Sequence, residues 1–470
     1  MGVRLLNAPA PAPANAGPSE APLPGTPLDS TRGEIRALTG LRLFAALSVV
    51  AYHFQFTRGE TYARILEPFQ PVIQSGALGV DLFFVLSGFV IAHVYAATLG
   101  PGLRPRAAGS FLWARLSRIW PVYALVTVGF GAWLLVRAQV DKDGIITAQV
   151  LQPSLGARSW VAQLLMVQLW NRPVVHGASF SGPSWSISAE WLAYLACPVL
   201  ILIAWRLRDA RPPVLAALAL IPLLPQLWIA AQPADPPFMW AMRIVGGFTS
   251  GVFVWLAVRR IPRDPRVSRI AGAVAAGALV EIAVVLAWSS AIGVGLDRNG
   301  VRGLAVFAFP VLIGALALSD RGPAAVLSHP WAVHGGRISY SLYLVHIPIF
   351  EFYWTAMADI PALAPGSALA AFLTPHVLLL PLVAAHLVWR FVEEPARLWM
   401  RARDPFRRPA PAHVRAPAQE PEPSAQAEPA RSSRRPRLDR GRATLAARHR
   451  RYRRLPARAE EQSPHLDHQG

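Results

Sequence analysis

The sequence predicts an all-α, polytopic integral membrane protein with about ten transmembrane helices. Hydrophobic residues make up 53% of its 470 positions, charged residues make up only 16%, and 16 tryptophans are present. The mean hydropathy is +0.34. Soluble domains carry about 25% charged residues on average, so this composition argues against a water-soluble fold.

Apolar stretches follow one another along the chain, and each is close to the ~20 residues that a helix needs to cross ~30 Å of hydrocarbon. The ten predicted spans are Leu38–Phe56, Gly76–Tyr95, Ile119–Val136, Trp185–Trp205, Val214–Ala231, Met239–Val258, Ile270–Trp288, Gly303–Ser319, Ile338–Met357 and Ala368–Phe391. Residues 1–33 are rich in Pro and Ala and lack the apolar core of a signal peptide, which predicts a disordered leader. Residues 34–400 are expected to form the membrane domain, and residues 401–470 a disordered tail rich in Arg and Pro.

The Arg and Lys content of the connectors predicts the orientation in the membrane. The leader and the connectors after the even-numbered spans hold 17 of these residues, whereas the opposite connectors hold eight. Both termini are therefore expected in the cytoplasm. The longest connector, residues 137–184, is expected outside.

Charge and cysteine content restrict the function further. The net charge is +19, but the last seventy residues hold 17 arginines against eight acidic residues, so the tail alone supplies +9. We interpret the tail as a solvated segment that contacts anionic membrane lipid, and we expect no nucleic-acid partner. The single cysteine, Cys197, leaves no internal disulfide and no thiolate metal cluster. Neither a metal nor a bound cofactor is expected.

Ionisable side chains within the spans are candidate functional residues, because each costs roughly 2.5–3.5 kcal/mol to insert. Arg42 and His53, in LRLFAALSVVAYHF, are eleven residues apart. This spacing is about three helical turns, so the two share one face and lie ~16 Å apart along the axis. Arg42 would bind an anionic molecule near the cytoplasm, and His53 would exchange a proton nearer the outside. An interfacial histidine and a snorkelling arginine explain the spacing equally well.

Two acidic residues are candidates for partners of His53. Asp81, in GVDLFF, and Glu190, in SWSISAEW, both follow the outer ends of their spans, at depths that His53 could share. A carboxylate beside an imidazole fixes its tautomer and stabilises its charged form, which is the arrangement of a general base. Alternatively, either acid neutralises Arg42 or Arg243.

Two arginines mark the cytoplasmic end of the third span. Arg115 and Arg118, in WARLSRIWP, are three residues apart. Together they could clamp phosphate groups by charge-assisted hydrogen bonds. A positive-inside anchor explains them equally well.

Six segments, spread in order from Arg36 to Trp399, resemble the acyltransferase family 3 membrane proteins, a group of polysaccharide and lipopolysaccharide O-acetyltransferases. These segments are RALTGLRLFAALSVVAYHF, GALGVDLFFVLSGFVIA, FLWARLSRIWPVY, SGPSWSISAEWLAYLACPVL, GRISYSLYLVHIPIF and FVEEPARLW. Any one of them is a weak signal, but six in the family's order are a strong one.

The resemblance implies a membrane O-acyltransferase of the bacterial inner membrane. Acyl-CoA, with acetyl-CoA the expected donor, would be used from the cytoplasm, and the acyl group would pass to a hydroxyl of a surface glycan, a lipid-linked sugar or another small molecule such as a macrolide. Arg42 and His53 match the family's essential pair. The other matching positions are Arg115 and Arg118 at the third span, Glu190 after the Trp-Ser element, and Tyr343 and His346 in the Tyr-Leu-x-His element.

Three mechanistic classes follow from these residues. In direct transfer, His53 removes the acceptor proton while Glu190 or Asp81 steadies the imidazolium. The arginines hold the CoA phosphates, and Tyr343 and His346 belong with them to the residues that bind substrate or donor. A covalent acyl-histidine route uses the same residues. The alternative class is a transporter that uses the buried charges as a relay, although the chain shows no internal repeat of the kind common in transporters.

Overall fold

The computed structural model describes residues 33–57, 66–140, 146, 151–232, 235–291 and 301–407, and these are almost entirely helical, without a β-strand. The elements are α1 (Arg36–Phe54), η2 (Glu67–Phe69), α3 (Gln70–Gln74), α4 (Leu78–Leu99), α5 (Pro105–Val140), α6 (Ala157–Leu164), η3 (Gly182–Ser184), α7 (Trp185–Arg206), α8 (Pro212–Leu220), η4 (Ile221–Leu223), α9 (Pro225–Ala230), α10 (Met239–Val258), α11 (Pro265–Ala291), η5 (Val301–Phe307), α12 (Ala308–Leu318), α13 (Pro323–Leu327), α14 (Pro330–Asp359), η6 (Pro361–Leu363), α15 (Ala368–Val388), the π-helical η7 (Trp389–Glu393) and α16 (Glu394–Ala402). The predicted leader and tail lie outside the described residues, apart from residue 33 and residues 401–407.

The helices confirm a polytopic membrane protein but not the count of ten spans. Eight helical segments among the described residues are long and apolar enough to cross a membrane, and each overlaps one of the predicted spans. The predicted span Gly303–Ser319 is a shorter apolar segment, Gly303–Leu318. The predicted span Ile338–Met357 lies inside the 30-residue α14, whose apolar sequence is interrupted by buried polar residues such as His346 and Glu351.

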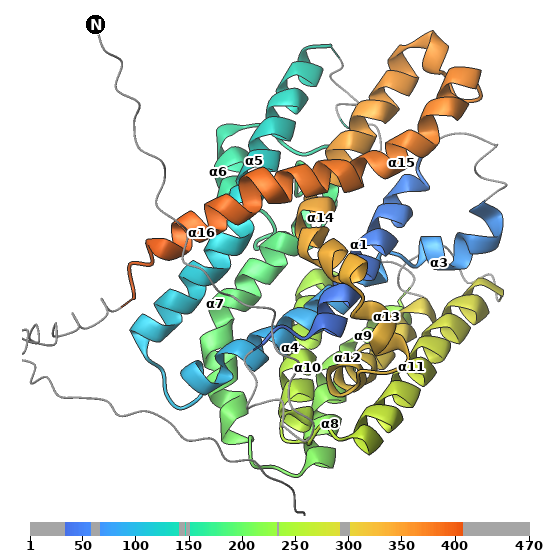
Figure 1. The fold of residues 1–470 in the computed structure, drawn as a ribbon. Helices are drawn as coiled ribbons and strands as arrows, with labels where there is room; N and C mark the ends of the chain where they lie inside the picture. The colour runs from blue at the N-terminus through green and yellow to red at the C-terminus, as the bar shows by residue number, and fades with distance from the viewer. Residues whose placement is uncertain are drawn as a thin grey trace, which may run out of the picture. The chain divides into compact units, whose positions relative to one another are not determined.

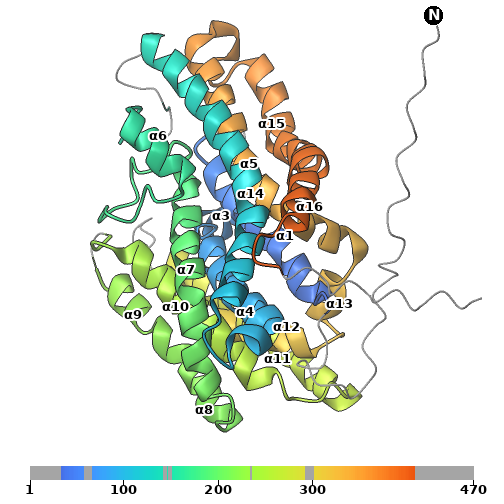
Figure 2. The ribbon, with the colours of Figure 1, turned by 90° about the vertical axis from the view of Figure 1, so that its left-hand side faces the viewer.

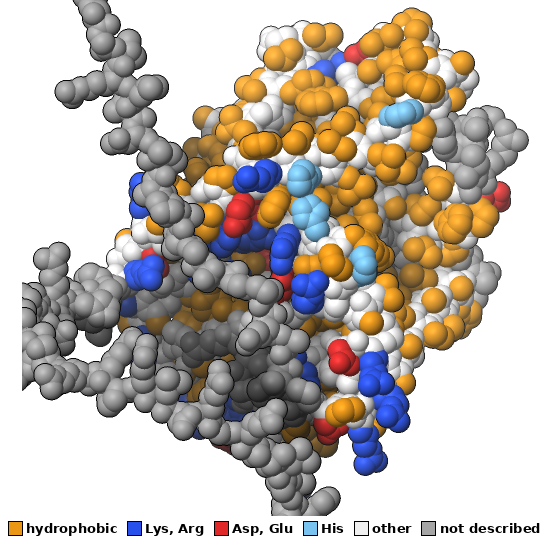
Figure 3. All heavy atoms as spheres, in the orientation of Figure 1, with side chains coloured by type: hydrophobic (Ala, Val, Ile, Leu, Met, Phe, Trp, Pro, Cys, Tyr) orange, Lys and Arg blue, Asp and Glu red, His pale blue; other side chains and the backbone are white. Residues whose placement is uncertain are grey.

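Large apolar side chains cover the outer surface of the described helices. Val280 and Val284 of α11 are 62% and 59% exposed, and Phe372 of α15 is 64% exposed. Figure 3 shows hydrophobic side chains spread over much of one face. Soluble monomers rarely expose contiguous apolar areas of this extent, so these faces are suited to contact with lipid.

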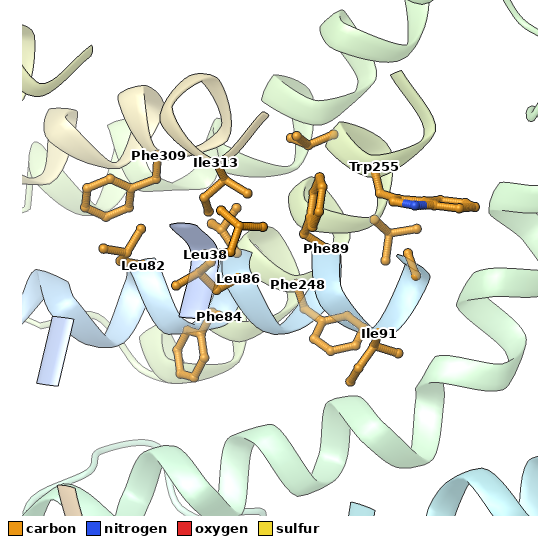
Figure 4. Packing of buried hydrophobic residues seen from close by; sticks show 14 of the residues in the cluster. Leu38, Leu82, Phe84, Leu86, Phe89, Ile91, Phe248, Trp255, Phe309 and Ile313 are labelled. Carbon is orange, nitrogen blue, oxygen red and sulfur yellow. The ribbon is translucent and has the colours of Figure 1, made fainter. Parts of the chain in front are cut away.

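The central packing joins α4 to its neighbours α10 and α12 (Figure 1). Small residues bring α4 and α10 into close contact, because a Cβ at Gly88 would collide with the Phe248 carbonyl oxygen. Such small-residue contacts are the usual way in which membrane helices approach one another. On the other side of α4, Figure 4 shows Phe309 and Ile313 of α12 lying against Leu82 and Leu86.

A second close pair is formed by α1 and α14, which together carry much of the candidate site (Figure 2). A Cβ at Gly336 would collide with the Thr39 carbonyl oxygen. Just before α1, Glu34 accepts a 2.8 Å hydrogen bond from Arg337. Burial raises the pKa of Glu34, but the hydrogen bond and charge of Arg337 outweigh it and hold that pKa below its ordinary value. These contacts fix the relative register of the two helices.

Candidate active site

The first helix carries Arg42 and His53 near opposite ends, and each lines a different cavity. We call the cavity of about 490 Å³ that is lined by His53, Arg243, Glu351 and Tyr343 the histidine cavity. We call the cavity of about 130 Å³ that is lined by Arg42, Arg115, Arg118, Glu190 and Tyr343 the arginine cavity. The predicted sharing of one helix face by Arg42 and His53 is consistent with this placement, since both side chains border the interior.

The partner that the structure gives to His53 is a second histidine, His346 of α14. The His346 Nε2 atom lies 3.3 Å from His53 Nδ1, and the ring centroids are 5.1 Å apart. His53 Nδ1 also lies 2.9 Å from the Val49 carbonyl oxygen. Because a carbonyl oxygen only accepts, Nδ1 carries the proton in the neutral ring, and Nε2 is its basic nitrogen.

The same reasoning assigns the tautomer of His346. Its Nδ1 lies 3.2 Å from the Leu342 carbonyl oxygen, so this nitrogen donates and Nε2 accepts. The Nδ1 proton of His53 is therefore shared between the Val49 carbonyl and His346 Nε2. His346 is fully buried, so this contact is made away from solvent. The resemblance placed His346 among the residues that bind substrate or donor, and the structure places it directly against His53.

The histidine cavity contains a further ionisable residue that the sequence did not single out as a site residue. Glu351 lies on α14, five residues after His346, and its side chain is fully buried. The cavity walls also include the aromatic residues Tyr52, Trp185 and Trp354. A carboxylate buried beside apolar rings costs free energy unless a partner or a ligand compensates its charge. The signal available in the sequence was a lone Glu in the apolar run IPIFEFYW.

Asp81 has a different partner from the one predicted. Its two carboxylate oxygens accept hydrogen bonds of 2.8 and 2.7 Å from Nε and Nη2 of Arg243. Both residues are buried, and the Arg243 guanidinium lies 5.2 Å from the centroid of the Trp185 ring. Asp81 therefore holds Arg243 in the wall of the histidine cavity, which corresponds to the alternative in which this acid neutralises an arginine.

Glu190 also lies apart from His53, in the arginine cavity. Its Oε1 atom accepts hydrogen bonds from Ser87 Oγ at 2.8 Å and from Tyr194 Oη at 2.5 Å. Glu190 follows the start of α7 at a depth comparable with the prediction. Its side chain lines the same cavity as Arg42, and this lateral position separates it from His53. The structure thus brings neither predicted acid into the histidine cavity.

Three guanidinium groups gather in the arginine cavity, and among the described residues of its lining Glu190 supplies the one carboxylate. Arg115 donates from Nη2 to Tyr95 Oη at 3.2 Å, and its Nε is buried without a hydrogen-bond partner among the described residues. A buried donor without an acceptor is costly, so the cavity is suited to an anionic ligand. Arg115 and Arg118 lie together here, as the predicted phosphate clamp requires.

Arg118 has a carboxylate partner that sequence reasoning missed. It forms an ion pair with Glu393 of η7, whose other oxygen accepts a 2.6 Å hydrogen bond from Ser341. Glu393 is buried and stands in FVEEPARLW, one of the six segments that carry the family resemblance. Its distance from Arg118 along the chain, 275 residues, explains why no local pattern revealed the pair.

Tyr343 belongs to the walls of both cavities. Its hydroxyl lies 2.7 Å from Ser186 Oγ and donates to the Pro183 carbonyl at 2.9 Å. These partners belong to the Gly-Pro-Ser-Trp-Ser segment at the start of α7. Tyr343 is therefore fixed where the arginine and histidine cavities approach each other.

The helices and these two polar cavities define a multi-pass membrane protein with a buried, charge-lined site. The family comparison specifies the class further: the acyltransferase 3 family model, described as an acyltransferase domain, matches residues 35–386. The chain belongs to this family and is an acyltransferase that transfers groups other than aminoacyl groups. This membership favours the enzyme over the transporter alternative.

Several characterised proteins are similar to the chain. Acyltransferase MdmB of Streptomyces mycarofaciens is 27% identical over 401 residues, which cover 80% of this chain and 95% of that protein. Peptidoglycan O-acetyltransferase OatA of Listeria monocytogenes is 24% identical over 391 residues, 78% of this chain and 56% of OatA. Exopolysaccharide production protein ExoZ of Rhizobium meliloti is 25% identical over 306 residues, 64% of this chain and 84% of ExoZ. No solved structure matches the chain.

Proposed function

We propose that the protein transfers an acyl group, with acetyl the expected one, from acyl-CoA to a hydroxyl of an acceptor, with His53 as general base. The observation that carries this proposal is the pair of cavities that share Tyr343, one lined by three arginines and the other by His53. A donor with phosphate groups needs cationic partners, and the arginine-lined cavity offers these. An acceptor hydroxyl needs a base that takes its proton, and His53 lines the other cavity.

The arginine cavity is the proposed donor site. Arg42, Arg115 and Arg118 supply planar donors that suit phosphate oxygens. Its volume of about 130 Å³ is too small for a whole coenzyme, so we assign it to the acyl-bearing end and to the nearest anionic groups. In this assignment the bulk of the coenzyme remains on the cytoplasmic side, where the predicted orientation places Arg42.

The histidine cavity is the proposed acceptor site. The acceptor oxygen attacks the thioester carbonyl while His53 Nε2 takes its proton, and the carbon–sulfur bond then breaks. The proton passes to the coenzyme thiolate, so the products are an ester and free CoA, and the histidine is regenerated. His346 Nε2 accepts a hydrogen bond from the Nδ1–H group of His53 throughout, which keeps the ring oriented.

A surface glycan or lipid-linked sugar is the proposed acceptor, in the bacterial inner membrane with both termini cytoplasmic. The aromatic walls of the histidine cavity support a ring-shaped acceptor, since aromatic side chains pack against the apolar faces of such ligands. The names of OatA and ExoZ refer to peptidoglycan O-acetylation and exopolysaccharide production. A macrolide-like acceptor is the alternative acceptor class, and it would fit the same cavity.

The proposal is tested by single-turnover acyl transfer with detergent-purified protein and labelled acetyl-CoA. We expect His53→Gln to lower transfer by roughly 10²–10⁴-fold, the usual contribution of a positioned acid–base group, with acetyl-CoA affinity nearly unchanged. His376→Gln is the matched control, because His376 is an exposed histidine on α15. Transfer by His53→Gln at the wild-type rate would refute the assignment, and label trapped on His53 would replace general-base catalysis by the acyl-histidine route.

A further inference from the structure

A third hollow lies away from both cavities, between α8, α10, α11 and α12. We call this volume of about 390 Å³ the apolar groove. All of the described residues that line it are apolar, and several are small, including Ala216, Ala271 and Gly314. Figures 1 and 2 show these four helices beside one another, and α8, α11 and α12 each contact a neighbour in the group. Neither the donor nor the acceptor proposal uses this groove.

One end of the apolar groove is bordered by a strongly basic rim. The lining residues Val258, Ile261, Val267 and Ile270 each stand next to, or within two positions of, an arginine in the sequence. The helix ends and connectors at this end, residues 206–211, 259–269 and 319–321, hold nine arginines against three aspartates. Figure 3 shows basic side chains gathered with fewer acidic ones at the lower end of the visible face.

The three aspartates at this rim already have partners within the protein. Asp209 accepts from Arg260 at 2.6 Å, and Asp264 accepts from the backbone N–H groups of residues 266 and 267, both at 2.8 Å. Asp320 accepts from Ser268. Arg266 and Arg269 are exposed, and no carboxylate in the described part of the chain forms an ion pair with either. Excess positive charge therefore remains at the mouth of the groove.

We infer that the apolar groove with its arginine rim is a binding site for an anionic phospholipid. One acyl chain would lie in the groove, and the phosphate would be held by Arg266 and Arg269. The charges are complementary, because an apolar channel that ends in uncompensated arginines matches an apolar chain that ends in an anionic headgroup. Basic pockets between membrane helices bind anionic headgroups for this reason. A zwitterionic lipid satisfies the apolar part of the site but carries its own cation.

The test uses the full-length protein, purified in detergent and supplied with phosphatidylglycerol or phosphatidylcholine at equal concentration. Retained lipid is counted by native mass spectrometry, and the unfolding midpoint is followed by tryptophan fluorescence. We expect the wild type to retain phosphatidylglycerol selectively and to gain thermal stability from it. Replacing both Arg266 and Arg269 by Gln should weaken this retention roughly 10- to 30-fold, since each arginine near a headgroup contributes a factor of about five.

Two matched controls make the result specific. Replacing Arg104 and Arg106 by Gln removes the same charge from exposed positions before and at the start of α5, away from the groove, and should leave retention unchanged. Ala216→Phe should fill the groove and reduce retention, whereas Ala217→Phe, on the same helix but outside the lining, should not.

Equal retention of the two lipids by the wild type, or equal losses in the two arginine double variants, would overturn the inference. Occupation of the groove by a second copy of the chain would also overturn it. Native mass spectrometry would then show a dimer, and Ala216→Phe would dissociate this dimer. These results would leave the acyl-transfer proposal untouched, because its residues lie in the other two cavities.

Discussion

The buried pair of Asp81 and Arg243 provides a decisive test of the site geometry. Asp81→Asn keeps the size of the side chain but removes its charge. The structure predicts a loss of stability as the main effect, because both carboxylate oxygens are bonded to Arg243. A role in steadying the His53 imidazolium predicts instead a loss of turnover in protein of normal stability.

The magnitude follows from burial and distance. Asp81 is 3% exposed and Arg243 is 6% exposed. For charge centres ~4 Å apart at an effective dielectric constant of ~20, the attraction is about 4 kcal/mol. Removing one partner of a buried pair leaves the other uncompensated and costs about 3–5 kcal/mol. For a protein of this size, we expect the unfolding midpoint to fall on the order of 5 °C.

The measurement is thermal unfolding of detergent-purified variants, combined with acyl transfer per folded molecule. The double variant Asp81→Asn with Arg243→Gln removes both charges, so it should be more stable than Asp81→Asn alone. This difference gives the coupling free energy of the pair. Asp209→Asn is the control, since the exposed Asp209 pairs with Arg260 at the surface and should leave the midpoint unchanged.

Two results would refute this reasoning. If Asp81→Asn unfolds at the wild-type midpoint, the bidentate pair does not stabilise the protein. If the folded variant loses turnover by more than about 10²-fold and shifts the pH dependence of transfer, Asp81 acts on the base, as first predicted from the sequence.

Three further predictions concern the arginine cavity and the orientation. Arg42→Ala should weaken acyl-CoA binding about 10- to 100-fold, the range for a lost hydrogen bond to a charged group. Arg42→Lys should recover only part of the affinity, because lysine lacks the planar guanidinium. Equal binding by the wild type and both variants in an affinity titration would exclude Arg42 from the donor site. Glu393→Gln removes the counter-charge of Arg118, so it should tighten acyl-CoA binding while lowering the unfolding midpoint, and unchanged values of both would contradict the pairing. A reporter fused after Trp399 should be cytoplasmic and one in residues 137–184 external, and the opposite pattern would place His53 on the donor side.

The length of the apolar stretches predicted most of the fold, because hydrocarbon imposes a fixed length on each helix. Eight predicted spans overlap helices that are long and apolar enough to cross. The remaining two deviate for physical reasons. The segment Gly303–Leu318 is shorter, and α14 carries buried polar residues, including His346 and Glu351, that lower its apolar character. The polar residues of the candidate site on α14 therefore lower the hydropathy by which a membrane span is predicted.

The depth of the candidate residues was predictable, but their lateral partners were not. Helical rise places Asp81 and Glu190 a similar distance inside their helices, which is why both were considered for His53. Which neighbour each side chain meets depends on helix rotation and packing, and these are set by long-range contacts such as Gly88 against Phe248. Asp81 therefore meets Arg243, and Glu190 meets Ser87 and Tyr194.

The choice of a histidine rather than a carboxylate beside His53 has a physical consequence. A carboxylate would stabilise the imidazolium more strongly, but it would add a charge within the membrane interior, at a cost of several kcal/mol when it is unpaired. His346 Nε2 accepts a hydrogen bond from the Nδ1–H group of His53 without adding charge. In the proposed mechanism the neutral pair of His53 and His346 adds no charge until His53 takes a proton, so positive charge on this pair develops only during transfer. His346→Phe would remove this acceptor, whereas the Val49 carbonyl would still accept from Nδ1, so His53 would lose orientation while keeping its tautomer.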